Sequence, residues 1–112
     1  FTDDVLSSFP KEGFGFFDPD TPVVSKSKQA ALDVIGAAVR AVDGVEKGSF
    51  NNAYVVARPP GHHSGTALGP KGFCTFNNIS IASNYLINKY KHKKVAVLDI
   101  DVHHGDGSQS LF

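Results

Sequence analysis

The sequence predicts an α/β domain built on a parallel sheet. Three observations support this: two short apolar runs of strand composition at residues 53–57 and 95–98, helical patterns before and between them, and polar loops directly after both. A strand–helix–strand order favours a right-handed parallel crossover. Both polar loops would then open at one edge of the sheet, where α/β proteins place their sites.

The composition argues against several classes of protein. Among 112 residues, 11 acidic side chains balance 11 basic ones, so charge gives no case for direct binding to nucleic acid or to an anionic membrane. No apolar run is long enough to cross a bilayer. The lone cysteine, Cys74, excludes an internal disulfide framework and fits a reducing compartment.

The first helix is predicted from Ser25 or Ser27 to Lys47. Serine is a good N-cap, and Gly48 is a fitting stop. Before this helix, residues 14–22 carry turn residues without a sustained period, which predicts a loop. The packed face of the helix is predicted from apolar residues at helical spacing: Ala31, Ile35, Ala38, Val42 and Val45.

A second helix is predicted from about Phe76 to Tyr90, with Thr75 or Asn77 as its cap. It follows the apolar run at 53–57 and the loop after that run. Two prolines and a glycine end the run and break the strand there. The packed stripe of the helix is predicted to be Ile79, Ala82, Leu86 and Tyr90.

Most of the ionisable side chains suited to chemistry follow the two apolar runs. After the first come His62 and His63; after the second come Asp99, Asp101, His103, His104 and Asp106. Alternate side chains of an extended chain share a face, so Asp99, Asp101 and His103 point the same way if the strand persists. Carboxylates and an imidazole crowded there favour a divalent metal. The cluster therefore predicts metal-assisted hydrolysis, with a carboxylate-held histidine moving the proton.

Other hydrolytic sites explain these residues less well. Ser64 lies near the histidines, but no nucleophile elbow surrounds it. A cysteine protease centred on Cys74 would leave the aspartates without a purpose.

Three motifs resemble those of the zinc-dependent histone deacetylase family. They are RPPGHH at 58–63, GFCTFNN at 72–78 and DIDVHHGDG at 99–107, with a weaker match in DPDT at 18–21. The first and third look more like the class II branch. The resemblance implies an arginase-like three-layer fold with a central parallel sheet. The chain lacks methionine and ends soon after the third motif, so we expect residues 1–112 to be the N-terminal part of such a catalytic domain.

The resemblance assigns catalytic roles position by position. His63 would be the general base and acid, and His62 would be its electrostatic partner. Asp106 would support His63, and Asp99 would support His62.

The resemblance also assigns the metal ligands. Asp101 and His103 would bind zinc, and the third ligand, an aspartate, would lie beyond Phe112. Asp99 would also lie beside a structural potassium ion. Since a catalytic zinc usually takes three protein ligands, we expect residues 1–112 alone to bind zinc poorly and to be inactive.

The substrate implied by the resemblance is an acetylated lysine. Gly72 would offer its carbonyl to the substrate amide, Phe73 would line the acyl-lysine tunnel, and Asp20 would hold the substrate backbone at the rim. A long apolar stem that ends in an amide suits an aromatic-walled tunnel. The implied function is removal of acetyl groups from histones or other proteins, with the protein expected in the nucleus and/or the cytoplasm.

Three alternatives to this function remain. An acetylpolyamine amidohydrolase would use the same residues with a different tunnel mouth. A catalytically weak acyl-lysine-binding scaffold of a corepressor-like complex remains open because the family's oxyanion-stabilising tyrosine would lie beyond Phe112. An arginase-like binuclear manganese hydrolase is disfavoured, because Gly105 stands where that family has an aspartate.

Overall fold

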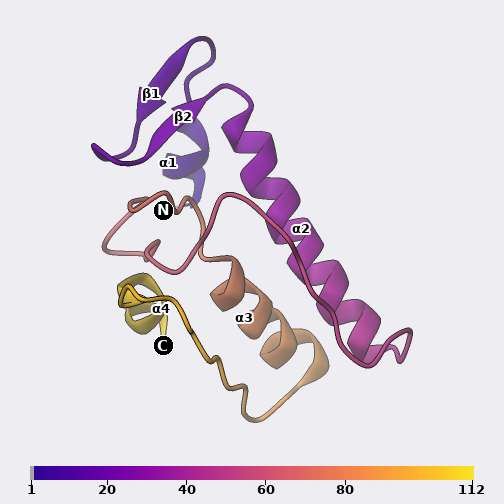
Figure 1. Ribbon diagram of the computed structural model, residues 1–112. Coiled ribbons are helices and arrows are strands. Elements are labelled where there is room, and N and C mark those ends of the chain that lie inside the picture. Colours follow the sequence, from indigo (N-terminus) through magenta and orange to yellow (C-terminus); the bar gives the residue numbers. More distant parts are fainter. Residues whose placement is uncertain (1) are drawn as a thin grey trace.

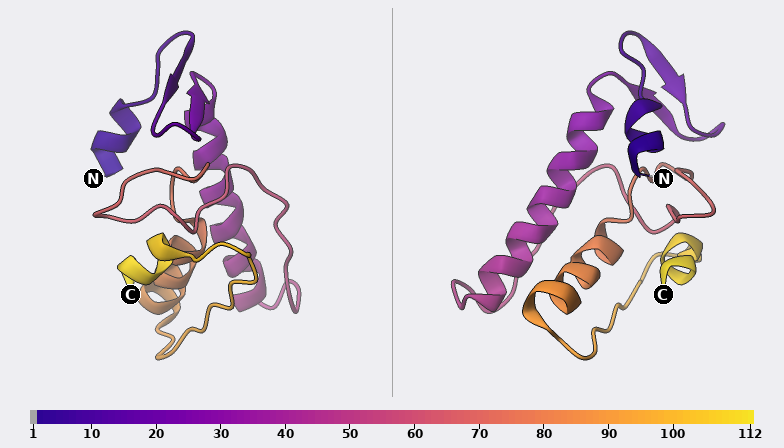
Figure 2. Two further views of the ribbon diagram at one scale, coloured as in Figure 1. Left: turned by 60° about the vertical axis from the view of Figure 1, so that its left-hand side comes forward. Right: turned by 180° about the vertical axis from the view of Figure 1, so that it is seen from behind.

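The computed structural model describes residues 2–112, and one long helix runs along one side of it (Figures 1 and 2). Helices α2 and α3 lie side by side, and the N-terminal hairpin sits at one end of α2. The elements in order are α1 (Thr2–Ser7), β1 (Phe14–Phe16), β2 (Pro22–Val24), α2 (Ser27–Glu46), α3 (Asn78–Tyr90) and α4 (Asp106–Leu111).

Helix α2 confirms the first predicted helix, and its end was placed correctly. Gly48 follows the helix with φ of 71°, and its N–H donates to the carbonyl of Val45 at 3.0 Å. The predicted serine cap was wrong: the N-cap residue is Lys26, and the Ser27 hydroxyl instead accepts from the Val24 N–H at 2.9 Å. The hydroxyl thus ties β2 to the helix rather than capping it.

Helix α3 confirms the second predicted helix and one of its two predicted caps. The Asn77 side chain accepts from the Ser80 N–H at 3.1 Å, so the helix begins at Asn78 rather than at Phe76. The capping residue has non-helical dihedrals (φ −81°, ψ 87°), which sets this boundary. Phe76 itself is buried in the core.

Asp43 of α2 joins the two helices. Its Oδ1 accepts hydrogen bonds from Tyr85, Tyr90 and Lys89 of α3, at 3.0, 2.7 and 2.9 Å. The bonds from Tyr90 and then Lys89 hold the pKa of Asp43 well below its usual range. This contact fixes α3 against the C-terminal half of α2.

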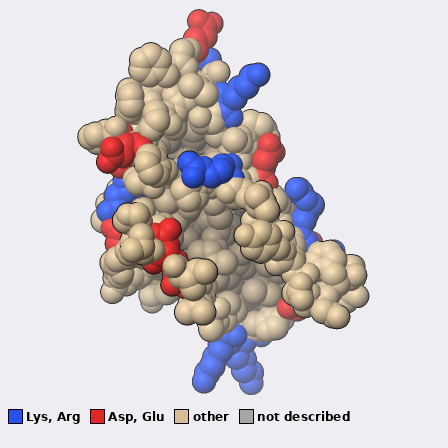
Figure 3. Space-filling view, viewed as in Figure 1, with Lys and Arg blue, Asp and Glu red and all other residues tan. Residues whose placement is uncertain are grey.

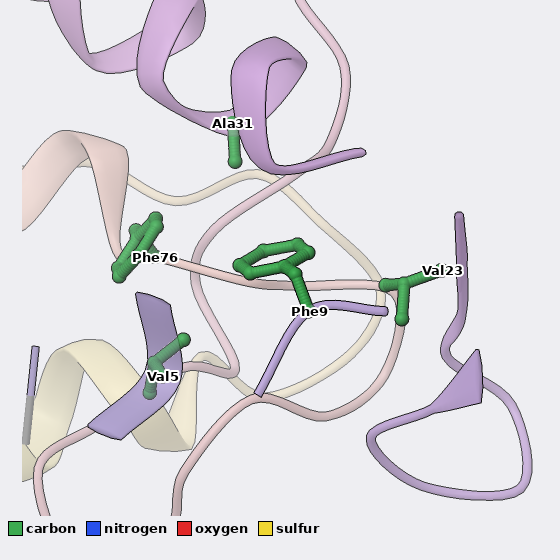
Figure 4. Close-up of a cluster of buried hydrophobic side chains, with 5 residues drawn as sticks. All are labelled: Val5, Phe9, Val23, Ala31 and Phe76. Atoms are coloured by element: carbon green, nitrogen blue, oxygen red, sulfur yellow. The ribbon is translucent and has the colours of Figure 1, made fainter. Parts of the chain in front are cut away.

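A small hydrophobic core lies where the N-terminal elements meet the two long helices (Figure 4). It consists of Val5, Phe9, Val23, Ala31 and Phe76, all less than a tenth exposed. Burying a side chain such as phenylalanine stabilises a fold by about 1.5–3 kcal/mol. The core therefore holds α1 and β2 against the start of α3, beside the loops that carry the candidate site.

The N-terminal region is more ordered than its composition indicates. The predicted loop at 14–22 was wrong in part: β1 pairs antiparallel with β2, with Phe14 opposite Val24 and Phe16 opposite Pro22. Strands of three residues are too short to show a period, and burial of Val23 supports the pairing instead. The short helices α1 and α4 were likewise not predicted, since six residues show less than two turns of pattern.

The two predicted parallel strands are not formed within residues 2–112. Segments 53–57 and 95–98 belong to neither a helix nor a strand, and the hairpin is the one sheet in the described part of the chain. A strand exists only when its backbone finds a hydrogen-bonded neighbour, and these two segments do not bond each other. Their apolar side chains are exposed, with Tyr54 at 90% and Leu98 at 88%.

Acidic and basic side chains are both scattered over the face shown in Figure 3. None of the helices in residues 2–112 combines the length and apolarity needed to cross a membrane.

Candidate active site

The loop that carries His62 and His63 is fastened to the start of α3. Buried Ser64 donates its hydroxyl to the Thr75 carbonyl at 2.9 Å, and its own carbonyl accepts from the Asn77 side chain at 3.1 Å. The loop that carries the histidines is thus held by residues at the N-terminus of α3. Because its hydroxyl is committed to a buried carbonyl, Ser64 is not a nucleophile here.

Cys74 is equally unsuited to nucleophilic chemistry. It is fully buried, and its sulfur accepts from the His63 N–H at 3.5 Å. Burial raises the pKa of the thiol, whereas a catalytic cysteine needs a lowered one. The cysteine-protease interpretation therefore has no support in the structure.

Each of the two histidines contacts one aspartate from the third motif. His62 Nδ1 lies 2.8 Å from Asp99 Oδ2, and His63 Nδ1 lies 2.8 Å from Asp106 Oδ1. The two imidazole rings are neighbours, with centroids 4.1 Å apart. Two loops more than thirty residues apart in sequence thus meet through two neighbouring histidine–aspartate pairs. The family resemblance implies the same pairing of residues.

Gly105 makes room for the first of these pairs. A Cβ at this position would lie 2.7 Å from Asp99 Oδ2, the oxygen that contacts His62, and 3.3 Å from His62 Nδ1. Any larger residue would push the carboxylate away from the imidazole. This close approach gives the glycine of the third motif a physical reason.

Asp101 and His103 lie together beside the two pairs. Asp101 Oδ1 accepts from the His103 N–H at 2.7 Å and lies 2.9 Å from His103 Nδ1. The His103 ring centroid lies 6.0 Å from that of His63. The His103 backbone bond holds the pKa of Asp101 below its usual value, so its carboxylate is charged.

These two side chains fit a zinc ion as part of its ligand set. Carboxylate oxygen and imidazole nitrogen are both zinc ligands, with bonds of about 2.0–2.2 Å, and two ligands of a tetrahedral ion lie roughly 3.3 Å apart. Asp101 Oδ1 and His103 Nδ1 lie 2.9 Å apart, at hydrogen-bond distance, so the two groups are near enough to each other to reach one ion. Within residues 2–112 no group of three or more candidate metal ligands surrounds one point.

Lys71 is a charged residue at the site that sequence reasoning missed. Its ammonium group contacts Asp106 Oδ2, the carboxylate oxygen not used by His63. The Lys71 bond, followed by that of His63, holds the pKa of Asp106 well below its usual range. In the sequence, Lys71 is marked only by its place next to the Gly72–Phe73 motif. That place does not indicate Asp106 as its partner.

The turn that carries Gly72 and Phe73 packs on His63. Both residues have positive φ, 55° and 66°, and the Cys74 N–H closes the turn onto the Lys71 carbonyl at 2.9 Å. A Cβ at Gly72 would lie 2.6 Å from His63 Cδ2. A glycine is therefore needed there both for its dihedral and for its contact with the imidazole.

An open hollow of about 420 Å³ lies beside His63, His103 and Asp106. Its volume is within the size range of small-ligand sites. Asp20 lies on its wall, whereas Phe73 lines an adjacent hollow with Thr21 and Arg58. The rim role of Asp20 and the tunnel role of Phe73 stay predictions. The wall of the larger hollow is formed by Asp18, Asp20, His63, Lys71, Gly72, His103, His104 and Asp106.

Comparison with known proteins identifies one family of relatives. A family model described as the histone deacetylase domain matches residues 3–112. The type-2 histone deacetylase 1 of Dictyostelium discoideum is 41% identical over 99 residues, which cover 84% of this chain and 7% of that protein. The polyamine deacetylase HDAC10 of Rattus norvegicus is 42% identical over 97 residues, covering 87% of this chain and 15% of that protein.

A solved structure shares the fold as well. The crystal structure of the HDA15 HD domain superposes with a TM-score of 0.86 at 33% identity, over 98% of this chain and 30% of that one. This chain therefore spans less than a third of each of these three proteins. By family model, by relatives and by structure, the chain belongs to the histone deacetylase family.

Proposed function

We propose that the protein carrying this chain is a zinc-dependent amidohydrolase that removes acetyl groups from acetyl-lysine in histones or other proteins. The observation that supports this most is the placement of two histidine–aspartate pairs beside a carboxylate–imidazole pair of zinc-ligand chemistry. Asp101 and His103 would hold the metal together with a third ligand from the rest of the protein. A structural potassium ion beside Asp99 belongs to the same proposal.

The proton transfers would be carried by His63. Its Nδ1 is held by Asp106, so its Nε2 is the nitrogen that accepts a proton from the attacking water and later donates it to the lysine amine as the C–N bond breaks. When bound, zinc lowers the pKa of its water to about 7 and polarises the substrate carbonyl. His62, held by Asp99, lies beside His63 and stabilises charge there.

Substrate binding would use the wall of the hollow together with Phe73, which lines the adjacent one. We expect the Gly72 carbonyl to accept from the substrate amide, Phe73 to contact the lysine stem, and Asp20 to hold the peptide backbone at the rim. The packing of Gly72 on His63 supports this arrangement, because it brings a backbone carbonyl that can accept from the substrate amide close to the residue that would transfer the proton.

An acetylpolyamine is the second candidate substrate. Asp18 and Asp20 place two carboxylates on the wall of the hollow, and carboxylates suit the extra ammonium groups of a polyamine. A relative named a polyamine deacetylase is as similar as one named a histone deacetylase.

Acetate release by the full-length protein tests the proposal. We expect turnover of an acetyl-lysine peptide, and a loss of about 10²- to 10⁴-fold in His63→Ala with zinc content unchanged. Faster turnover of an acetylpolyamine than of the peptide would favour the second candidate. A zinc-loaded protein that binds the peptide and hydrolyses neither substrate would support the scaffold of a corepressor-like complex instead.

A further inference from the structure

Asp18 connects two parts of the candidate site that are far apart in sequence. Its Oδ1 accepts from the Asp20 N–H at 2.9 Å, which forms a local Asx turn, and its Oδ2 accepts from the Gly72 N–H at 2.9 Å, 54 residues along the chain. One carboxylate therefore fixes both the rim residue and the turn that packs on His63.

Thr21 strengthens the same connection. Its hydroxyl oxygen accepts from the Phe73 N–H at 2.9 Å, and the residue is only 2% exposed. Its own N–H donates to the Asp18 carbonyl at 3.0 Å, which closes the loop. Two side chains of a four-residue loop thus bind the two consecutive amides of the distant turn.

This turn needs external support. Phe73 is a non-glycine residue at a φ of 66°, a backbone conformation that L side chains adopt at a cost. Such a conformation persists where surrounding contacts impose it, and the bonds from Asp18 and Thr21 are those contacts. Without them, Gly72 and Phe73 would be free to relax away from His63.

The electrostatics agree with this geometry. Burial raises the pKa of Asp18, but hydrogen bonds from the Thr21 hydroxyl and from the Gly72 and Asp20 amides outweigh burial and hold it below its usual value. Asp18 is therefore an anion bound to backbone amides, and such charge-assisted bonds are stronger than neutral ones.

We propose that Asp18 is a positioning residue of the deacetylase, which holds the Gly72–Phe73 turn and the Asp20 rim in one geometry relative to His63. The inference rests on the proposed function, in which both the turn and the rim contact the substrate and so place its amide. Asp18 acts through Gly72 and Asp20, and Thr21 assists it.

The first test compares Asp18→Ala with wild type in the zinc-loaded full-length protein. Misplacing a substrate by about 1 Å can cost about 100-fold, so we expect kcat/KM on an acetyl-lysine peptide to fall about 10- to 100-fold with zinc content unchanged. Both kcat and KM should change, since turn and rim are released together. Asp33→Ala is the matched control, because Asp33 is an exposed α2 residue whose side chain contacts Gln29; it should keep wild-type kinetics.

The second test does not depend on activity. In wild type, the amides of Gly72 and Phe73 should exchange slowly with solvent, and in Asp18→Ala the Gly72 amide should exchange at least about tenfold faster. If Asp18→Ala does not fold, Asp18→Asn serves, since its one amide oxygen can accept from one of the two N–H groups. Thr21→Val should release the Phe73 amide, and Thr21→Ser should restore its protection.

The outcomes separate the two proposals. Unchanged kcat/KM and unchanged Gly72 exchange in a folded Asp18→Ala protein would overturn the positioning role. Faster exchange with unchanged kinetics would also overturn it, because the bond would then be structural only. If wild type hydrolyses neither peptide nor acetylpolyamine, the proposed function fails, and with it the positioning role, while wild-type Gly72 exchange still shows whether the contact exists.

Discussion

The two histidine–aspartate pairs have the same bond length and different surroundings. Each joins Nδ1 to a carboxylate oxygen at 2.8 Å. The second oxygen of Asp99 accepts from the Asp101 N–H at 3.1 Å, whereas the second oxygen of Asp106 is held by Lys71. One pair is therefore tied to the backbone of the candidate metal motif, and the other to the wall of the hollow.

We propose that the two pairs, although chemically identical, have different roles because their surroundings differ. His63 and Asp106 line the hollow where a substrate amide would lie, while His62 and Asp99 line a separate one with Asp101. A proton donor and acceptor must reach the substrate, and a metal-supporting group need not. We therefore propose proton transfer at the His63 pair, whereas in the other pair His62 stabilises charge beside His63 and Asp99 supports Asp101.

Removing Asp101 should have the largest effect, because both pairs would lose the metal beside which they work. In Asp101→Ala of the full-length protein, we expect metal analysis to find less than one tenth of the wild-type zinc. Deacetylation should fall by more than the about 10²- to 10⁴-fold expected for a lost general base. Full zinc occupancy in this variant would remove Asp101 from the ligand set.

Replacing each supporting aspartate by asparagine should affect a different property in each pair, zinc affinity in one and kcat in the other. Asp99→Asn should weaken zinc affinity by about 10- to 100-fold, because the anion is lost and one remaining oxygen cannot serve both the Asp101 amide and His62. Asp106→Asn should leave zinc affinity unchanged and lower kcat instead, through loss of the anion that holds His63.

Competition with a zinc chelator gives the affinity for this pair of variants, and acetate release at saturating zinc gives kcat. Equal effects of the two substitutions on both quantities would show that the pairs are equivalent, against the difference in their surroundings. Asp33→Asn is the control, since its side chain contacts only Gln29 among the interactions seen on α2.

The candidate site was easier to predict from the sequence than the sheet around it. The motifs at 58–63 and 99–107 named the residues that meet, and the structure brings His62 to Asp99 and His63 to Asp106. Such contacts are between side chains that a motif specifies. The catalytic and metal-binding roles themselves stay predictions.

The sheet depends on partners that the two apolar runs do not provide for each other. Segments 53–57 and 95–98 have strand composition, but hydrogen bonds define a strand, and these segments do not pair within residues 2–112. A hairpin is found instead at 14–24, where composition favoured a loop, and its Val23 is buried in the core. Tertiary burial overrode local propensity in this region.

Lys71 and Asp18 escaped prediction for a related reason. A lysine in a polar loop is usually solvated, and an aspartate before proline usually makes a local turn. Asp18 does make that turn, yet it also reaches Gly72, and Lys71 reaches Asp106. Only the folded loops show these second partners, because nothing in the local sequence specifies them.

Lys71→Met should have the smallest effect and should reveal how much the lysine contributes to the second pair. The folded-state pKa of Asp106 lies below its unfolded value of about 3.9, chiefly because of Lys71, so this contact stabilises the fold above about pH 4. The stabilisation disappears as the pH falls below that value and through the folded pKa. Both side chains are about one third exposed, so solvent screening keeps the effect small.

We therefore expect the full-length Lys71→Met protein to melt no more than about 4 °C below wild type at pH 7. The difference should shrink steadily as the pH is lowered from about 4, and Lys71→Arg should restore most of the stability. Thermal melts at several pH values and at low and high salt measure this. A difference that grows on acidification would contradict the sign of the Asp106 shift, and one insensitive to salt would show that packing of the lysine stem, rather than its charge, supports the pair.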